Sequence, residues 1–275
     1  MKKEVIWDRY NANVIESNAK NLVGIVTIKP QSSIKPQSLI KSQSSIKSQS
    51  IKPTQKNDEG EWRMKYPQVT VGIIAKNEEK HIGETINSIL QSDYPPKNYE
   101  IVIVDGNSAD KTQEIVKRLS KSNKNIRLII EPWKKGTHGK ARNLLVENAR
   151  GEYIAFTDAD CIVERNWLKV LVTNLEREKK ENKQVVAVGG IRYPAKTQKW
   201  RENLLNNMMS TFFGSGGSKG FMKTTKKYVD SIPGYNSIFT KEVLQKERYD
   251  DEIGFGEDYE FNMRLNMKGY KLVFN

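Results

Sequence analysis

The sequence predicts an α/β protein whose mostly parallel sheet carries helices on both faces, preceded by a disordered N-terminal segment. Two observations lead to this fold class. Short runs of β-branched and other apolar residues alternate with segments whose apolar residues recur at helical spacing, the pattern of right-handed β-α-β crossovers. By contrast, the first 65 residues are too polar and too basic to form a core of their own.

The N-terminal region, residues 1–65, is predicted to be a disordered basic tether. A short unit that begins with Ile-Lys recurs between residues 28 and 55, and it contains no acidic and no aromatic residue. Its prolines remove backbone donors that a stack of short strands would need, so a β-helix is disfavoured. Contact with anionic lipid is an alternative, but a solvated tether is the favoured interpretation.

Composition indicates a reducing compartment and an anionic partner. The single cysteine, Cys161, rules out an internal disulfide and is interpreted as a small buried apolar residue rather than a reactive thiol. Residues 1–10 lack the apolar core of a secretory signal, and no later stretch is long enough to cross a bilayer. We therefore expect a cytoplasmic protein, with peripheral membrane contact as an open alternative. The formal net charge of +13 favours nucleic acid, a lipid surface or a phosphorylated substrate as partner.

Four predicted strands alternate with three predicted helices in residues 66–160, the first part of the folded region. The strands are runs rich in Val and Ile, and the helices have apolar residues three or four positions apart. Ligands of such a sheet bind beyond the carboxyl ends of the strands. The predicted strands cover 69–74, 99–104, 126–130 and 153–156, and the helices carry Ile82, Ile86, Ile89 and Leu90, then Ile115, Val116 and Leu119, then Ala141, Leu144, Leu145 and Ala149.

Residues 161–275 are predicted to continue the fold with a further helix and strand. The helix carries Leu168, Leu171, Val172 and Leu175, its charged run at 176–183 is predicted to be a solvated face, and a strand is expected at 185–190. The largest apolar cluster lies at 200–213 and is either a core helix or a surface for a lipid-linked acceptor or the membrane interface. The glycine-rich stretch at 214–220 is a candidate lid.

Three polar loops follow predicted strands at the same edge of the sheet. They lie at 75–79, 105–110 and 158–160, and the last contains Asp158 and Asp160. In an extended chain these two side chains point the same way. Two convergent carboxylates suit Mg²⁺ or Mn²⁺, which prefers oxygen ligands and can share them with a diphosphate.

Five stretches in order resemble family 2 of the glycosyltransferases, which have the GT-A fold. They read VGIIAKNEE (71–79), IVDGNSADKT (103–112), GKARN (139–143), TDAD (157–160) and GEDYEF (256–261). The resemblance implies an inverting transfer of a sugar from a nucleotide diphosphate donor, aided by Mn²⁺ or Mg²⁺. It covers the chain from about residue 67, so we expect a domain at 66–275. Its nucleotide-sugar-binding half would be 66–160 and its acceptor half 161–275, which is short at its C-terminal end compared with this family.

The resemblance implies donor and metal roles for particular residues. Asp105 lies where the family's acid contacts the nucleotide base, and a carboxylate there can accept from a uracil N–H. Arg142 can hold the base or diphosphate, and the alternative is a solvated helix residue. Asp158 would hold ribose or the metal through water, while Asp160 would coordinate the metal directly. The loop residues expected to pack on base and ribose are Ala75, Asn77 and Glu79; for Glu79, a helix-start acid remains an equal alternative.

The resemblance also implies a catalytic base and an acceptor pocket. Asp258 would accept the proton of the acceptor hydroxyl, and Glu257 beside it would face the acceptor. An acidic helix start after Gly256 is the alternative for both. Asn236 lies in a stretch that resembles the acceptor-pocket lining, and His138 is interpreted as a loop residue rather than a metal ligand.

Two other classes of protein compete with this interpretation. A nucleotidyltransferase of similar fold would show a glycine-rich phosphate loop after the first strand, and 75–79 contains no glycine. A non-catalytic basic protein that binds membrane or nucleic acid is the alternative function, although motifs for stacking on RNA are absent. The expected partners are therefore a nucleotide-sugar donor and a glycan or polyprenyl-phosphate-linked acceptor, with no nucleic acid.

Overall fold

The computed structural model describes residues 55–56, 62–63, 66–190 and 227–274. Almost all of the Ile-Lys repeats, the apolar cluster at 200–213 and the glycine-rich stretch at 214–220 lie outside the described residues. Disorder of residues 1–65 and the lid therefore stay predictions. Within the N-terminal region, β1 (Gln55–Lys56) pairs antiparallel with β2 (Trp62–Arg63).

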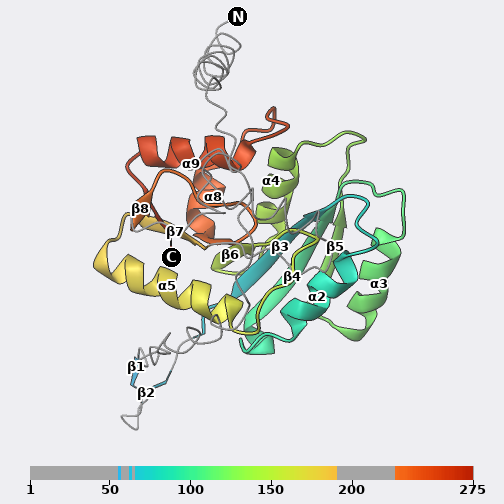
Figure 1. Ribbon diagram of the computed structural model, residues 1–275, viewed down its shortest axis with the longest axis horizontal. Coiled ribbons are helices and arrows are strands. Elements are labelled where there is room, and N and C mark those ends of the chain that lie inside the picture. The colour runs from blue at the N-terminus through green and yellow to red at the C-terminus, as the bar shows by residue number, and fades with distance from the viewer. Residues whose placement is uncertain (1–54, 57–61, 64–65, 191–226, 275) are drawn as a thin grey trace, which may run out of the picture. The chain divides into compact units, whose positions relative to one another are not determined.

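In the described part of the chain, eight strands form one mixed sheet in the order β5-β4-β3-β6-β9-β7-β10-β8 (Figure 1). The four strands that were predicted between residues 66 and 160 pair with one another in parallel, which confirms the α/β class. β9 lies antiparallel between β6 and β7, and β8 lies antiparallel to β10. The strands are β3 (Val69–Ala75), β4 (Tyr99–Asp105), β5 (Ile126–Ile130), β6 (Tyr153–Phe156), β7 (Val185–Gly189), β8 (Tyr228–Val229), β9 (Ser237–Thr240) and β10 (Lys271–Phe274).

Helices cover both faces of the sheet, as predicted. On one face the apolar side chains of α2, α3 and α5 join the buried cluster, and on the other face those of α4, α8 and α9 do so. This division places α4 and α9 on the same side, where they come to carry most of the candidate site (Figure 1). The helices are α2 (Ile82–Leu90), the short 3₁₀ helix η1 (Pro96–Asn98), α3 (Thr112–Ser122), α4 (His138–Asn148), α5 (Trp167–Glu181), α8 (Lys241–Glu247) and α9 (Glu257–Met267).

The central strands read as unbroken apolar runs because both of their faces are buried. In β4, Ile101 and Ile103 face one cluster while Val102 and Val104 face the other. On β3, Gly72 allows α4 to approach closely, since a Cβ there would lie 2.7 Å from the Leu145 side chain. The close approach fixes α4 against the sheet.

Strand register brings the polar loops to one edge. Ala75 at the end of β3 pairs with Asp105 at the end of β4, and Asp105 in turn pairs with Ile130 at the end of β5. The three strands therefore end level with one another, and the loops that follow β3 and β4 lie side by side. This arrangement is what the sequence predicts for a ligand-binding edge.

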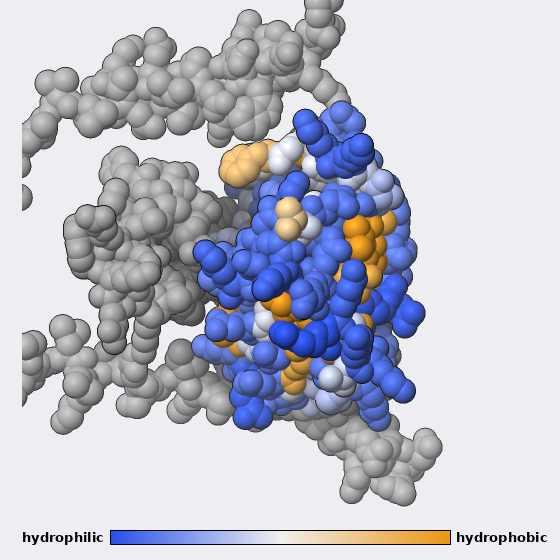
Figure 2. Space-filling model, turned by 90° about the vertical axis from the view of Figure 1, so that its right-hand side faces the viewer, coloured by the Kyte–Doolittle hydropathy of each residue, from blue (hydrophilic) through white to orange (hydrophobic). Residues whose placement is uncertain are grey.

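The surface on the side of α3 and β5 is mostly hydrophilic, with small apolar patches (Figure 2). The prediction that the charged run at 176–183 is a solvated face is wrong at Glu178, which is buried in α5. Its carboxylate lies 3.1 Å from Nη2 of Arg177 and 2.8 Å from Nζ of Lys227. The reason is tertiary: Lys227, directly before β8, pairs with Glu178 of α5, and a paired carboxylate can be buried.

Candidate active site

The loops after β3 and β4 are hydrogen-bonded to one another. Asn77, in the left-handed region at φ 58°, donates its N–H to Oγ of Ser108 at 2.8 Å, and its Oδ1 accepts from the N–H of Ala109 at 2.8 Å. The Oε2 of Glu79 accepts from the N–H of Lys111 at 3.0 Å. The side chains of Asn77 and Glu79 thus build the shape of this edge by joining the two loops.

Asp105 is fully buried at the end of β4, directly beside Ala75. Its Oδ1 accepts from the N–H of Ser108 at 3.0 Å and from Nε2 of Gln113 at 2.6 Å, and its Oδ2 accepts from Oγ of Ser108 at 2.6 Å. A nucleobase that reaches this carboxylate would have to share it with Ser108 and Gln113. Contact of Asp105 with the base therefore stays a prediction. Gln113, which sequence reasoning missed, is a further residue that binds this carboxylate.

The acidic pair lies in a turn rather than in an extended strand. β6 ends at Phe156, and the N–H of Cys161 donates to the carbonyl of Asp158 at 3.3 Å. The predicted reason for the pair's convergence, side-chain alternation along a strand, is therefore wrong. The turn is instead held by α2, where Oγ1 of Thr85 donates to the carbonyl of Ala159 at 2.8 Å.

The turn nevertheless gathers metal-ligating groups. Ligand atoms of Asp158, Asp160 and Cys161 all lie within 4.8 Å of one another. The prediction that Cys161 is a buried apolar residue is wrong, because its partly exposed thiol lies 3.7 Å from Oδ1 of Asp160. Two carboxylates with exposed Asp160 oxygens fit a hard divalent cation that keeps water ligands, so these residues could hold Mg²⁺ or Mn²⁺.

Arg142 is a buried cation at the centre of the site. Its Nε donates to Oε1 of Glu257 at 3.1 Å, and both side chains are 6% exposed. Its guanidinium carbon lies 4.9 Å from the centre of the Phe156 ring and 5.5 Å from that of Tyr249. The alternative of a solvated helix residue is therefore wrong for Arg142, because α9 and β6 close over it.

Polar groups from three separate segments surround Arg142, and two of these segments supply acids. Burial alone would lower the pKa of Arg142, but Tyr249, Glu257, Asp258 and Asp158 together raise it. The turn after β6, with Asp158, and the start of α9, with Glu257 and Asp258, are the two that bring acids near this guanidinium. This is the point at which the predicted donor side and the predicted acceptor side meet.

His138 is the first residue of α4 rather than a loop residue, and it pairs with Glu257. Its Nδ1 lies 3.6 Å from Oε2 of Glu257. This contact raises the pKa of His138, although burial opposes the rise. Burial alone would raise the pKa of Glu257, yet His138 and Arg142 lower it to about 2. Glu257 is thus held ionised by the Arg142 guanidinium and the His138 imidazole, which makes it a poor proton acceptor at neutral pH.

We expect the ion pairs of Glu257 with Arg142 and His138 to make the free energy of unfolding depend on pH. Because the folded pKa of Glu257 is about 2 and its ordinary value is 4.5, its contribution is present above about pH 4.5 and is lost as pH falls towards 2. Glu257→Gln should lower the free energy of unfolding at pH 6 by roughly 1.5–3 kcal/mol, the range for a hydrogen bond to a charged group.

Urea unfolding of wild type and Glu257→Gln at pH 6 and pH 3 measures this difference. The gap between the two proteins should narrow at the lower pH. His138→Gln is the companion variant: its effect should be largest below about pH 6.5 and should fade as pH rises through the raised pKa of His138. A difference in free energy of unfolding from wild type that stays constant from pH 3 to pH 9 for both variants would contradict the ion-pair assignment.

Asp258 lies in the first turn of α9, after Gly256, whose φ of 79° is easy only for glycine. The helix dipole favours an ionised carboxylate at this end. Its Oδ2 accepts from the N–H of Gly234 at 3.2 Å, so the segment before β9 aims the side chain. Asp258 and Glu257 are adjacent, yet only Glu257 is paired with Arg142.

Gly234 leaves room for both Arg142 and Asp258. A Cβ at this position would lie 2.6 Å from Nη2 of Arg142 and 3.1 Å from Oδ2 of Asp258. We therefore expect Gly234→Ala to lower the free energy of unfolding by about 1–3 kcal/mol, the usual cost of overpacking. Gly254→Ala is the matched control, because a Cβ at Gly254 meets nothing within 4 Å. Equal thermal stability of the two variants would contradict this close fit.

Asn236 lies two residues after Gly234, just before β9. Its Oδ1 accepts from Nε1 of Trp167 at 2.9 Å, and its carbonyl accepts from the N–H of Gly190 at 2.9 Å. Asn236 thus joins the start of α5 to the end of β7. Its predicted contact with the acceptor stays a prediction.

The structure brings the predicted residues together in two groups. Ala75, Asn77, Glu79 and Asp105 form the interlocked loops after β3 and β4. Around buried Arg142, Glu257 accepts a hydrogen bond from it, Asp258 borders Gly234 together with it, and the turn with Asp158 follows Phe156, which Arg142 faces. Sequence reasoning missed Tyr249, whose ring centre lies 5.5 Å from the guanidinium carbon of Arg142 and whose backbone Asn143 binds. No local motif marks Tyr249, because its importance depends on the packing of α9 against α4.

Comparison with solved structures shows the class of protein that this fold defines. A mannosyltransferase from Pyrobaculum calidifontis in complex with GDP-Man and Mn²⁺ superposes with a TM-score of 0.58 at 24% identity, over 77% of this chain and 55% of that chain. Staphylococcus aureus TarS (residues 1–349) in complex with UDP-GlcNAc gives a TM-score of 0.55 at 20% identity, over 76% of this chain and 56% of that chain. At these identities the likeness shows the fold, which is that of GT-A glycosyltransferases.

The family then follows from the sequence match. The pattern described as "Glycosyl transferase family 2" covers residues 70–248, and the chain belongs to this family.

Curated relatives of known name match part of their own length. A Methanococcus voltae dolichyl N-acetyl-α-D-glucosaminyl phosphate 3-β-D-2,3-diacetamido-2,3-dideoxy-β-D-glucuronosyltransferase is 31% identical over 213 residues, which is 75% of this chain and 64% of the relative. Glycosyltransferase AglE of Haloferax volcanii is 35% identical over 38% of this chain and 34% of the relative. The chain thus spans less than two thirds of the length of these relatives. Among the helices that the structure describes, none has the length and apolar character needed to cross a bilayer.

Proposed function

We propose that the chain is an inverting, metal-dependent glycosyltransferase that moves a sugar from a nucleotide diphosphate-sugar, UDP-linked in the first instance, to a glycan or lipid-linked acceptor. The observation that carries the proposal is the set of groups packed around buried Arg142. Its guanidinium carbon lies 4.9 Å from the ring centre of Phe156, the last residue of the strand that leads to Asp158 and Asp160. The side chains of Arg142 and Asp258 both border Gly234, since a Cβ there would lie 2.6 Å from Nη2 of Arg142 and 3.1 Å from Oδ2 of Asp258. The segment with the acids suited to a metal–diphosphate complex and the acid suited to proton transfer thus lie beside one cation. A glycosyltransferase needs both functions on either side of one reacting carbon.

Each acid has a distinct task in this proposal. Asp160 and Asp158 would hold Mn²⁺ or Mg²⁺, which when bound neutralises the departing diphosphate. Asp258 takes the proton of the acceptor hydroxyl while the hydroxyl oxygen bonds to the anomeric carbon. The bond from that carbon to the donor phosphate oxygen breaks, and its electron pair leaves with the nucleotide diphosphate. Attack from the face opposite the leaving group inverts the configuration.

Arg142 and Glu257 support these tasks from inside the site. The neighbouring carboxylates keep Arg142 charged, so the site retains a fixed positive charge near the region proposed for the diphosphate. Glu257 stays ionised at neutral pH because its pKa is about 2. Asp258, which accepts a hydrogen bond from Gly234, is therefore the better candidate for the base.

The donor and acceptor halves of the domain follow from this assignment. Residues 66–160, with the interlocked loops and Asp105, would bind the nucleotide and its sugar, and 161–275 would bind the acceptor. Names of the relatives support an acceptor that carries phosphate: one acts on a dolichyl phosphate-linked sugar and another on poly(ribitol-phosphate). The net charge of +13 favours such an acceptor.

The experiment that tests the proposal is a binding and turnover panel on the whole chain. UDP, UDP-GlcNAc and GDP-mannose are titrated by calorimetry with and without Mn²⁺, and donor hydrolysis is then followed for each sugar nucleotide. We expect metal-dependent binding of one nucleotide and slow, metal-dependent hydrolysis of its sugar. Binding without turnover of any donor, with or without sugar acceptors, would favour the non-catalytic alternative instead.

A further inference from the structure

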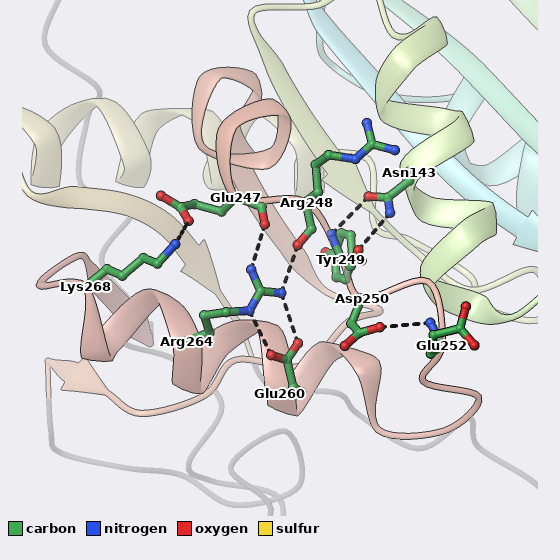
Figure 3. A network of polar contacts seen from close by, with 9 residues as sticks. All are labelled: Asn143, Glu247, Arg248, Tyr249, Asp250, Glu252, Glu260, Arg264 and Lys268. Atoms are coloured by element: carbon green, nitrogen blue, oxygen red, sulfur yellow. Dashed lines mark hydrogen bonds and ion pairs between the residues drawn. The ribbon is translucent and has the colours of Figure 1, made fainter. Parts of the chain in front are cut away.

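The segment from Glu247 to Asp251 lies between α4 and α9, the two helices that carry the core of the candidate site. Arg248, the first residue after α8, has a positive φ of 47° with ψ 147°, a backbone conformation that favours glycine. A residue other than glycine is strained there, so the surrounding contacts must hold it. Figure 3 shows that these contacts come from both helices: Asn143 of α4 and Arg264 of α9.

Asn143 holds the segment from the α4 side. Its buried side-chain amide accepts from the N–H of Tyr249 at 3.0 Å and donates to the carbonyl of Tyr249 at 2.9 Å (Figure 3). It also donates to Oδ1 of Asp251 at 2.8 Å. One amide thus satisfies both backbone groups of a buried residue, a role that neither Asp nor Ala can repeat. Nearby, Gly139 lets α4 approach, since a Cβ there would lie 2.2 Å from the carbonyl oxygen of Asp250.

Arg264 holds the same segment from the α9 side. Its Nη1 donates to the carbonyl of Glu247 at 2.6 Å, and its Nη2 donates to the carbonyl of strained Arg248 at 2.8 Å. Its Nε and Nη2 also donate to the two carboxylate oxygens of Glu260, at 2.7 and 3.0 Å. The planar guanidinium is thereby fixed in one orientation, which a lysine could not reproduce.

Tyr249, gripped from both sides, contacts the candidate site directly. Its ring stacks on Phe261 of α9 with 4.3 Å between ring centres, and the guanidinium carbon of Arg142, on α4, lies 5.5 Å from the Tyr249 ring centre. The Tyr249 ring thus contacts both helices beside the hydrogen bond that Arg142 donates to Glu257.

We propose that Asn143 and Arg264 are positioning residues that use the segment 247–251 to set α4 and α9 at the separation the active site requires. The inference rests on the proposed function in that Asp258 is taken as the base. Neither residue touches substrate in this proposal. Through their contacts with the segment that holds Tyr249, they position Arg142 and Glu257, and so the start of α9, where Asp258 lies.

The experiment combines kinetics with a reporter that needs no substrate. Asn143→Asp keeps the shape of the side chain but loses the two hydrogen bonds that the amide donates. Arg264→Lys keeps the charge but loses the planar guanidinium that binds two backbone carbonyls and Glu260 at once. We expect kcat for sugar transfer to fall by up to about 10²-fold in each, as for a misplacement of about 1 Å, with KM for the donor nearly unchanged. The controls are Asn148→Asp, on the same helix, and Arg127→Lys, whose arginine is similarly exposed and binds Glu100 and a backbone carbonyl away from this segment.

The reporter is the NMR titration of His138. The chain has two histidines, His81 and His138, so His81→Gln assigns both signals. In wild type, contact with Glu257 raises the pKa of His138. Both test variants should move the pKa of His138 back towards its ordinary value and leave the His81 signal unchanged. In the two control variants the pKa of His138 should be the same as in wild type. An unchanged His138 titration and kcat, or equal losses in the controls, would overturn the proposal. If wild type transfers no sugar, the proposed function fails while the His138 titration still decides whether the two residues position Glu257.

Discussion

Asp258→Asn should lower the rate of sugar transfer by about 10²- to 10⁴-fold, the usual contribution of a general base. Asparagine has the same shape and can still accept the hydrogen bond from Gly234 through its amide oxygen. It cannot take a proton from the acceptor hydroxyl. Donor and metal binding should therefore change little, and the loss should appear in kcat at saturating donor.

The measurement compares transfer by wild type and Asp258→Asn in parallel with calorimetry of the nucleotide. Asp93→Asn is the matched control, because Asp93 is a partly exposed carboxylate paired with Arg165 beyond the far end of α2. Transfer by Asp258→Asn at the wild-type rate would show that Asp258 is not the base. A large loss in Glu257→Gln would then make Glu257 the next candidate, in spite of its low pKa.

Asp160→Ala should remove the dependence of nucleotide binding on Mn²⁺ or Mg²⁺. The two carboxylates of the turn would supply the hard oxygen ligands of the proposed metal site, and Asp160 is the more exposed of the two. Loss of a group that merely supports a ligand typically weakens metal affinity 10–100-fold. Loss of a direct ligand should be at least as damaging, and donor turnover should fall with it.

Calorimetry of UDP with and without Mn²⁺ checks this result in wild type and in the variant. Glu164→Ala is the control, since Glu164 is an exposed acid four residues further along that does not belong to the group of ligand atoms. Equal nucleotide affinity with and without metal in wild type would contradict the metal site itself. A metal effect that survives in Asp160→Ala would move the site to other ligands.

The first half of the fold was predictable because its signals are local. β3 to β6 are short apolar runs bounded by polar loops, and α2 to α4 have apolar residues at helical spacing, so each element is recognisable alone. β8 and β9 were not predicted. β9 has four residues and is defined by the neighbours it joins, β6 and β7, which lie far from it in the sequence.

Burial of charged residues was also beyond the sequence. Glu178 stands in a run of charges and Arg142 at a helix start, and both positions read as solvated by pattern alone. A charge is buried when a partner arrives to pair with it, and the partners here, Lys227 and Glu257, lie 49 and 115 positions away. Cys161 was predicted to be a buried apolar residue from its type alone, and the turn after β6 instead leaves it partly exposed, with its thiol 3.7 Å from Oδ1 of Asp160.

The sequence by itself determined the α/β class, the edge where the loops meet, the family and the acids that carry the proposed chemistry. These depend on residue type, spacing and order, which the chain displays directly. Only the tertiary structure decided which of the two acids forms ion pairs. Glu257 pairs with Arg142 and His138, whereas Asp258 accepts a hydrogen bond from the backbone N–H of Gly234. The two acids are neighbours in the sequence with similar chemistry, and what distinguishes them is the set of distant groups that α4, β9 and α9 bring around each.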